Sequence, residues 1–184
     1  VLQQLARQHV VEFLQIIDTE FQQAQAVAFV NRFLRKLGPD IMNPALEWRE
    51  IAARLQDPRF ERRELAALYL DQSFLAGNGN YLRSEVTHHA GLHPKQKPCE
   101  LTRAQLGKLA RSTLEISRRS YDTRGITITP RLSKTLEKRG VARGSRRFYV
   151  FGRDDLPCYS CSTPIKYSEI NSRRLYHCPQ CQPA

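Results

Sequence analysis

Residues 71–94 read DQSFLAGNGNYLRSEVTHHAGLHP, a predicted helix set between two turns that contain glycine. Gly77 and Gly79 let the backbone turn sharply just before this helix, and Gly91 can end it. We predict that Asn80 caps the helix N-terminus. Two interpretations of the first turn stay open. It is either a plain connection between helices, or a turn whose free amides bind an anion such as a phosphate.

Helices are also predicted on both sides of this stretch, because apolar residues recur there at helical spacing. Upstream, the pattern predicts a short helix over residues 46–55 and a longer one over residues 62–75. Downstream, it predicts a helix over residues 102–116, capped by its first residue. Two further helices are predicted within residues 2–34, before the sequence Gly-Pro-Asp at 38–40 breaks the pattern.

The positive charge of the chain is concentrated in one segment. The net charge is +11, and residues 103–153 contain fourteen Lys or Arg against three acidic residues. Such a concentration is typical of a surface that binds a polyanion, because each neutralised phosphate releases condensed counterions. The alternative is a solvated surface that keeps the protein soluble. The segment lacks the large apolar anchors of a membrane-binding helix, so we expect no membrane partner.

Four of the five cysteines form two Cys-x-x-Cys pairs near the C-terminus, namely Cys158 with Cys161 and Cys178 with Cys181. Two such pairs can present four thiolates tetrahedrally to one ion, so the sequence predicts one structural Zn²⁺. Short strands are expected around it, over residues 148–184. A closed four-sulfur site has no open coordination position, so this metal would organise the fold and perform no chemistry.

Two other residues are candidates for chemistry. His177 could replace one cysteine as a ligand, but with four cysteines at hand a packing or surface role is the simpler interpretation. Cys99 has no evident activating partner and is interpreted as a bystander. Cysteines arranged for metal are typical of a reducing compartment. The sequence has no secretory signal and no apolar run of about 18 residues, so we expect a cytoplasmic, nucleoid-associated protein that is not secreted.

Taken jointly, these motifs resemble the formamidopyrimidine-DNA glycosylase and endonuclease VIII family over about four-fifths of the chain. Residues 77–94 resemble the helix-two-turn-helix of the family, and residues 37–40 resemble its interdomain linker. The pattern Tyr-x-Thr-Arg-Gly at 121–125 resembles the endonuclease VIII branch, and residues 151–182 resemble the zinc finger of the family.

The resemblance implies a mainly α fold, in which a helix-two-turn-helix helical domain is followed by a small β-hairpin zinc finger. Four parts are expected along the chain: a helical N-terminal segment that matches the family poorly (1–37), the helix-two-turn-helix DNA-binding domain (38–124), a long basic loop (125–147) and the four-cysteine zinc finger (148–184).

The resemblance also implies roles for individual residues. Asn80, in the turn with Gly77 and Gly79, matches the asparagine that binds a DNA backbone phosphate across the lesion site. Arg173 matches the zinc-finger arginine that grips a phosphate and is assigned the proton-donor role in the second elimination step. Arg124 is expected to contact DNA as well. The alternative for Arg173 is an exposed hairpin arginine with no ligand.

Three features depart from the family. The nucleophile of the family is an N-terminal proline followed by glutamate, whereas this chain opens with Val1-Leu2-Gln3, and residues 1–33 do not match the N-terminal β-sandwich. Asn78 stands where the family usually has an apolar residue. The stretch between Gly125 and Phe148 is longer than usual.

Enzymes of this family flip a damaged nucleotide out of the duplex, excise oxidised bases, pyrimidines above all, and cleave the strand through a covalent imine. We therefore expect the chain to be the DNA-binding half of a bifunctional DNA glycosylase and abasic-site lyase. Its partner would be double-stranded DNA with a damaged base or an abasic site, bound by a monomer. The alternatives are a non-catalytic zinc-containing DNA-binding module that lacks the nucleophile, and a zinc-ribbon protein of the transcription or translation machinery.

Overall fold

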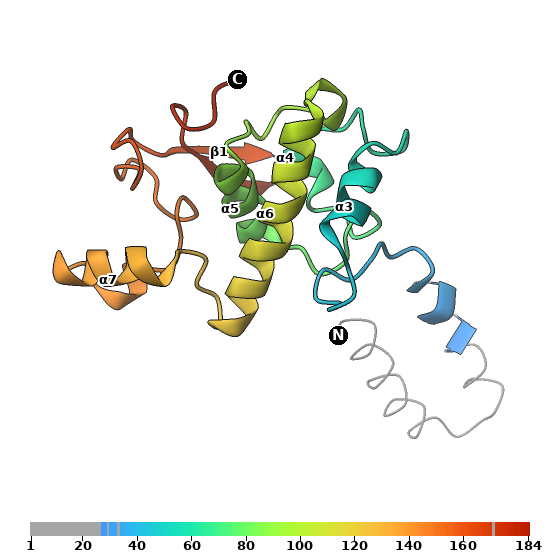
Figure 1. Ribbon diagram of the computed structural model, residues 1–184, viewed down its shortest axis with the longest axis horizontal. Helices are drawn as coiled ribbons and strands as arrows, with labels where there is room; N and C mark the ends of the chain where they lie inside the picture. The colour runs from blue at the N-terminus through green and yellow to red at the C-terminus, as the bar shows by residue number, and fades with distance from the viewer. Residues whose placement is uncertain (1–26, 29, 33, 171) are drawn as a thin grey trace.

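The computed structural model describes residues 27–28, 30–32, 34–170 and 172–184, so the two helices predicted within residues 2–34 lie mostly outside it. Figure 1 shows α5 and α6 side by side at the centre, with α3 and α7 on opposite sides of them. The elements are α3 (Trp48–Leu55), α4 (Leu65–Leu68), α5 (Asn80–Ala90), η1 (Pro98–Glu100), α6 (Arg103–Asp122), α7 (Pro130–Lys138), η2 (Arg143–Ser145), β1 (Lys166–Ile170) and β2 (Arg173–His177).

Strands β1 and β2 form an antiparallel hairpin in which Ile170 pairs with Arg173 and Lys166 pairs with His177. The prediction of a helix-rich chain that ends in a small β-hairpin is therefore confirmed. Within the described ranges, no helix has both the length and the apolar character needed to cross a bilayer.

The helical core is formed around α5 and α6, and two of the predicted helices in it are confirmed. Helix α3 falls inside the predicted range 46–55 and buries Ile51 and Leu55. Helix α6 begins after Thr102, whose hydroxyl accepts a hydrogen bond from the Gln105 amide at 3.3 Å. It continues six residues past the predicted end at 116. The residues that it buries there include serines, which an apolar pattern does not detect.

The helix predicted over residues 62–75 is shorter than expected. Only α4, residues 65–68, is α-helical, although the predicted inward residues Leu65, Leu68 and Phe74 are buried. The Asp71 carboxylate accepts a hydrogen bond from the Ser73 amide at 2.7 Å. Such a local hydrogen bond to a side chain replaces the backbone hydrogen bond of a helix, and the chain turns at this point.

The prediction of a loop over residues 125–147 was wrong in part, because residues 130–138 form helix α7. Thr129 caps this helix by accepting a hydrogen bond from the Leu132 amide at 3.2 Å, and Pro130 occupies the first helical position. Proline is well suited there, since that amide has no helical partner. Leu136 is the residue of α7 that is buried, so the apolar pattern was too sparse to reveal the helix.

The linker over residues 37–41 is packed against the segment that leads to α5. The Gly38 amide donates to the Gln72 carbonyl at 2.8 Å, and the Ala76 amide donates to the Pro39 carbonyl at 2.9 Å. A Cβ at Gly38 would lie 2.4 Å from the Phe74 carbonyl oxygen, so only glycine permits this approach. The predicted boundary is therefore a firm attachment that fixes the turn before α5.

Candidate nucleic-acid interface

The turn before α5 is held by its own side chains. Gly77 has a φ of +91°, a conformation that favours glycine. The Gln72 side chain accepts a hydrogen bond from the Gly77 amide at 2.9 Å and donates one to the Asn78 carbonyl at 3.0 Å. Asn78 is buried, and its side-chain amide donates to the Tyr69 carbonyl at 2.7 Å. This bond explains how a polar residue is accommodated at that position.

Asn80 does not cap α5, contrary to the prediction. Gly79 is the capping residue, with an extended backbone, and Asn80 is the first helical residue. A Cβ at Gly79 would meet no atom within 4 Å, so the surface beside the helix N-terminus is open. Asn80 is thereby left available for a ligand.

The N-terminal end of α5 has free donors. Among the described residues, none accepts a hydrogen bond from the backbone amides of Asn80, Tyr81 or Leu82. The Asn80 side-chain oxygen, an acceptor, is buried without a partner there, and no hydrogen bond of the Asn80 side-chain NH₂ group is found among the described residues. Unpaired amides and the positive end of the helix dipole favour an anion at this place.

Arg173 is exposed on β2, and Arg83 of α5 positions its backbone. The buried Arg83 guanidinium donates to the carbonyls of Arg173, at 2.9 Å, and Arg174, at 3.1 Å. It also donates to the Ala66 carbonyl at 3.0 Å. Burial, and then the charge of Arg173, lower the pKa of Arg83 to about 10, so it stays charged at neutral pH. Arg83 lies three residues after Asn80, so it ties the backbone of Arg173 to the first turn of α5.

Arg124 lies at the end of α6, where it has a φ of +56° and is exposed. This end of α6 is next to the start of α5, because the Tyr81 and Ser120 hydroxyl groups are 2.8 Å apart. The structure therefore places the three predicted DNA-contacting side chains on segments that meet at the N-terminal end of α5.

Glu85 joins this region to the segment that precedes the cysteines. Its carboxylate is fully buried and accepts hydrogen bonds from the backbone amides of Tyr149, Val150 and Phe151 at 2.8–2.9 Å, and from the Thr127 hydroxyl. Burial raises the pKa of Glu85, and the four donated hydrogen bonds oppose that rise. Short strands were expected from residue 148 onward, but residues 149–151 are in no strand, because their amides donate to Glu85 instead.

The four paired cysteines come together in one cluster. Their sulfur atoms all lie within 4.8 Å of one another, and three pairs are 3.4–3.9 Å apart. Tetrahedral zinc bound at about 2.3 Å would separate its sulfur ligands by about 3.8 Å, so the arrangement fits such an ion. The amides of Ser160 and Cys181 also point at cluster sulfurs, each at 3.5 Å.

Neighbouring side chains hold the cluster against α5. The fully buried Gln182 accepts a hydrogen bond from the Cys178 amide and donates one to the Leu92 carbonyl, both at 2.9 Å. His88 lies 3.8 Å from the Cys158 sulfur, and burial lowers the pKa of this histidine to about 4. A neutral imidazole there can donate its ring hydrogen to a thiolate.

The other two candidate residues, His177 and Cys99, lie outside the cluster. His177 packs edge-on against His93, with ring centroids 5.0 Å apart, and Cys99 is exposed. Sequence reasoning missed Arg83 and Gln182, because their acceptors are backbone carbonyls about 90 residues away.

Helices α4 and α5 are separated by turns over residues 69–79, and the four-cysteine hairpin packs against α5. This arrangement is that of a helix-two-turn-helix protein. The family model of the formamidopyrimidine-DNA glycosylase H2TH domain matches residues 37–131, more than half of the chain. The chain belongs to the formamidopyrimidine-DNA glycosylase and endonuclease VIII family.

Two relatives named Endonuclease 8 illustrate the match. The protein of Escherichia coli O9:H4 (strain HS) is 42% identical over 150 residues, which are 82% of this chain and 54% of the relative. The protein of Klebsiella pneumoniae (strain 342) is 39% identical over 165 residues, which are 90% and 59% of the two chains. The chain thus spans little more than half the length of these relatives.

Solved structures show the same fold. The crystal structure of the MutM (Fpg) protein from Thermus thermophilus matches with a TM-score of 0.65 and 27% identity, over 81% of this chain and 55% of that one. The Lactococcus lactis Fpg, in complex with DNA that contains an abasic site, matches with a TM-score of 0.67 over 85% of this chain and 55% of that one, at 21% identity.

Proposed function

We propose that this chain is the DNA-binding part of a base excision repair enzyme, a bifunctional DNA glycosylase and abasic-site lyase acting on oxidised bases, pyrimidines above all. One observation carries the proposal. The N-terminus of α5 has free amides, and Arg83 connects this end of the helix to the hairpin that bears Arg173. The relatives named Endonuclease 8, and the Lactococcus lactis protein solved with abasic-site DNA, support it.

Each site residue has a distinct part in the proposal. The Arg173 guanidinium grips a backbone phosphate with two parallel hydrogen bonds, and it serves as proton donor in the second elimination step. The Asn80 side chain and the α5 amides hold a second phosphate across the lesion site. Gly77 and Gly79 keep the turn close to that phosphate. Arg124 adds a third contact from the end of α6.

The cysteine cluster holds one structural Zn²⁺ in the proposal, with Cys158, Cys161, Cys178 and Cys181 as its ligands. A closed four-sulfur ion supplies no chemistry to the reacting atoms. Its part is to fix the hairpin, and hence Arg173, against α5.

The DNA-binding site is tested by substitution. Arg173→Ala is expected to weaken binding to abasic-site duplex about 10- to 100-fold, because a hydrogen bond to a charged group contributes about 1.5–3 kcal/mol. The slope of log affinity against log salt should fall by about 1. Asn80→Ala removes a neutral donor and should cost about fivefold. Fluorescence anisotropy at several salt concentrations measures both effects.

Arg174→Ala is the matched control, since successive side chains of a strand point to opposite faces. It removes the same charge from β2 and is expected to change binding little. If both site variants bind like the native protein at every salt concentration, the proposed contacts are wrong.

A non-catalytic zinc-containing DNA-binding module is the second candidate, because the geometry above concerns binding alone. Borohydride reduction separates the two. The natural protein, incubated with abasic-site duplex and borohydride, is expected to become covalently trapped through a reduced imine if it is a glycosylase and lyase. Tight binding without trapping would make it a binding module.

A further inference from the structure

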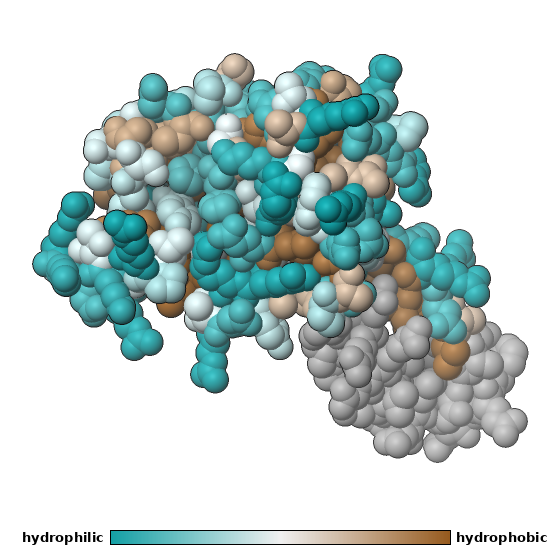
Figure 2. Space-filling model, in the orientation of Figure 1, coloured by the Kyte–Doolittle hydropathy of each residue, from teal (hydrophilic) through white to brown (hydrophobic). Residues whose placement is uncertain are grey.

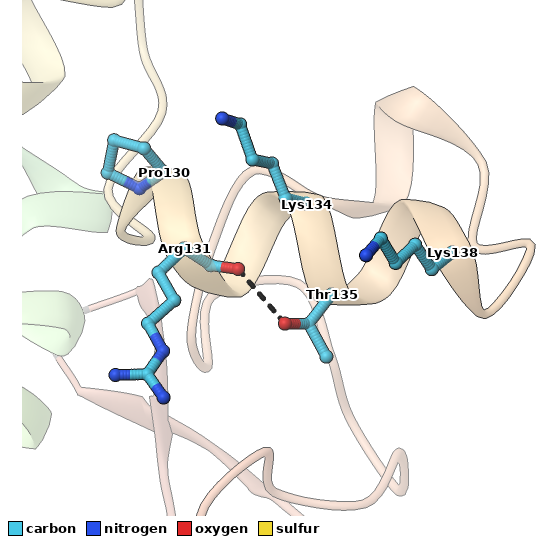
Figure 3. Close-up of a pocket in the computed structure, with 5 residues that line it drawn as sticks. All are labelled: Pro130, Arg131, Lys134, Thr135 and Lys138. Atoms are coloured by element: carbon cyan, nitrogen blue, oxygen red, sulfur yellow. Dashed lines mark hydrogen bonds between the residues drawn. The ribbon is translucent and has the colours of Figure 1, made fainter.

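Helix α7 has a cationic face with no ionic partner. Arg131, Lys134 and Lys138 line one surface hollow, and Figure 3 shows their side chains extending from the helix. Among the described residues, none of the three forms an ion pair. Hydrophilic side chains project from this part of the surface, at the lower left of Figure 2. Three positive charges are therefore exposed along about two turns of helix.

The single acidic residue of α7 does not neutralise this face. The Glu137 carboxylate lies 3.2 Å from the Arg146 guanidinium, which also donates to the Ser133 carbonyl at 3.4 Å. Leu136 is buried on the inner side. A protein interface is expected to have an apolar centre and few lysines, whereas the outer face of α7 is cationic. This composition fits a polyanion.

The segment that carries α7 is anchored beside the proposed DNA site. Before the helix, the Thr127 hydroxyl donates to Glu85 of α5, and the Thr127 amide donates to the Arg147 carbonyl at 2.8 Å. After it, the Phe148 ring packs 5.3 Å from the ring of Tyr81, the neighbour of Asn80. Arg124 lies on the connection between α6, which ends at Asp122, and α7, which begins at Pro130.

We propose that α7 binds backbone phosphates of duplex DNA next to the part of the duplex held by Asn80 and Arg173. The inference rests on the proposed function. The family model ends at residue 131, so it includes the first two residues of α7 and leaves residues 132–138 unmatched. Phosphate contacts carry no sequence information, so α7 strengthens binding to damaged and undamaged duplexes equally.

The test is the triple variant Arg131→Gln, Lys134→Gln, Lys138→Gln in the full chain. Glutamine is a good helix former, so α7 is retained while three charges are removed. The control, Lys95→Gln, Arg103→Gln, Lys108→Gln, removes three exposed charges near the opposite ends of α5 and α6. Affinity is measured over a salt series for an abasic-site duplex and for the same duplex undamaged.

The α7 variant is expected to reduce the slope of log affinity against log salt by about 2 to 3 for both duplexes, with their affinity ratio unchanged. The control should leave the slope unaltered. If the α7 variant behaves like the control while Arg173→Ala still weakens binding, the role of α7 is overturned and the proposed function stands. A changed affinity ratio also overturns it, since α7 would then read the lesion. Failure of the native chain to bind either duplex overturns both.

Discussion

Removal of the proposed Zn²⁺ is expected to unfold the C-terminal hairpin and to abolish DNA binding. The small core around the hairpin consists of five buried residues, and two of them, Cys158 and Cys178, are themselves cluster cysteines. So small a core cannot offset the loss of zinc binding, which contributes about 10–16 kcal/mol in comparable modules at neutral pH. Hydrogen exchange of the β1 and β2 amides during titration with a chelator measures this effect directly.

The helical part is expected to survive the same treatment. Its core is a separate cluster of nineteen buried residues within residues 46–116, so far-ultraviolet circular dichroism should keep most of its helical signal. Cys158→Ser should likewise remove the bound zinc and the protection of the hairpin amides from hydrogen exchange. Cys99→Ser, which alters the exposed cysteine outside the cluster, should change neither. A metal-free protein that keeps its hairpin protection would contradict the zinc proposal.

Sequence patterns predicted the elements whose signals are local. The periods of α3 and α6, the Thr102 cap and the left-handed Gly91 at the end of α5 are determined by neighbouring residues. The cysteine pairs likewise predicted a cluster, because two tight turns present four sulfurs by themselves. Helix α7 was not predicted, because it buries a single leucine and so shows no helical repeat of apolar residues.

The binding site was only partly predictable, for a different physical reason. Asn80 and Arg173 were identified by resemblance, whereas the contacts that bring them together involve backbone atoms far apart in sequence. Arg83 donates to backbone carbonyls on β2. Every residue has a backbone carbonyl, so the sequence does not indicate which one is the acceptor. Asn80 was assigned the cap because its residue type suits that position, but Gly79 takes it and leaves the asparagine free.

Glu85→Gln is expected to destabilise the protein by about 2–6 kcal/mol, measured as the free energy of unfolding in denaturant, because two buried donors would each lose an acceptor at about 1–3 kcal/mol. All four partners of the carboxylate are donors, namely three backbone amides and the Thr127 hydroxyl. A side-chain amide turns an NH₂ group toward one pair of them, so buried donors lose their acceptor. DNA affinity should fall as well, since these bonds attach the α7 segment and the hairpin to α5.

The size of this loss also reports the charge of Glu85. Burial raises the pKa of this carboxyl group, and a protonated glutamic acid would be replaced by glutamine at little cost. An ionised carboxylate that accepts four hydrogen bonds could be replaced by glutamine only at a large cost in stability. Glu115→Gln is the control, because Glu115 is half exposed, pairs with Arg119 and should cost less than about 1 kcal/mol. A Glu85→Gln variant as stable as this control would show that the buried group is neutral and that the four donors do not require a negative charge.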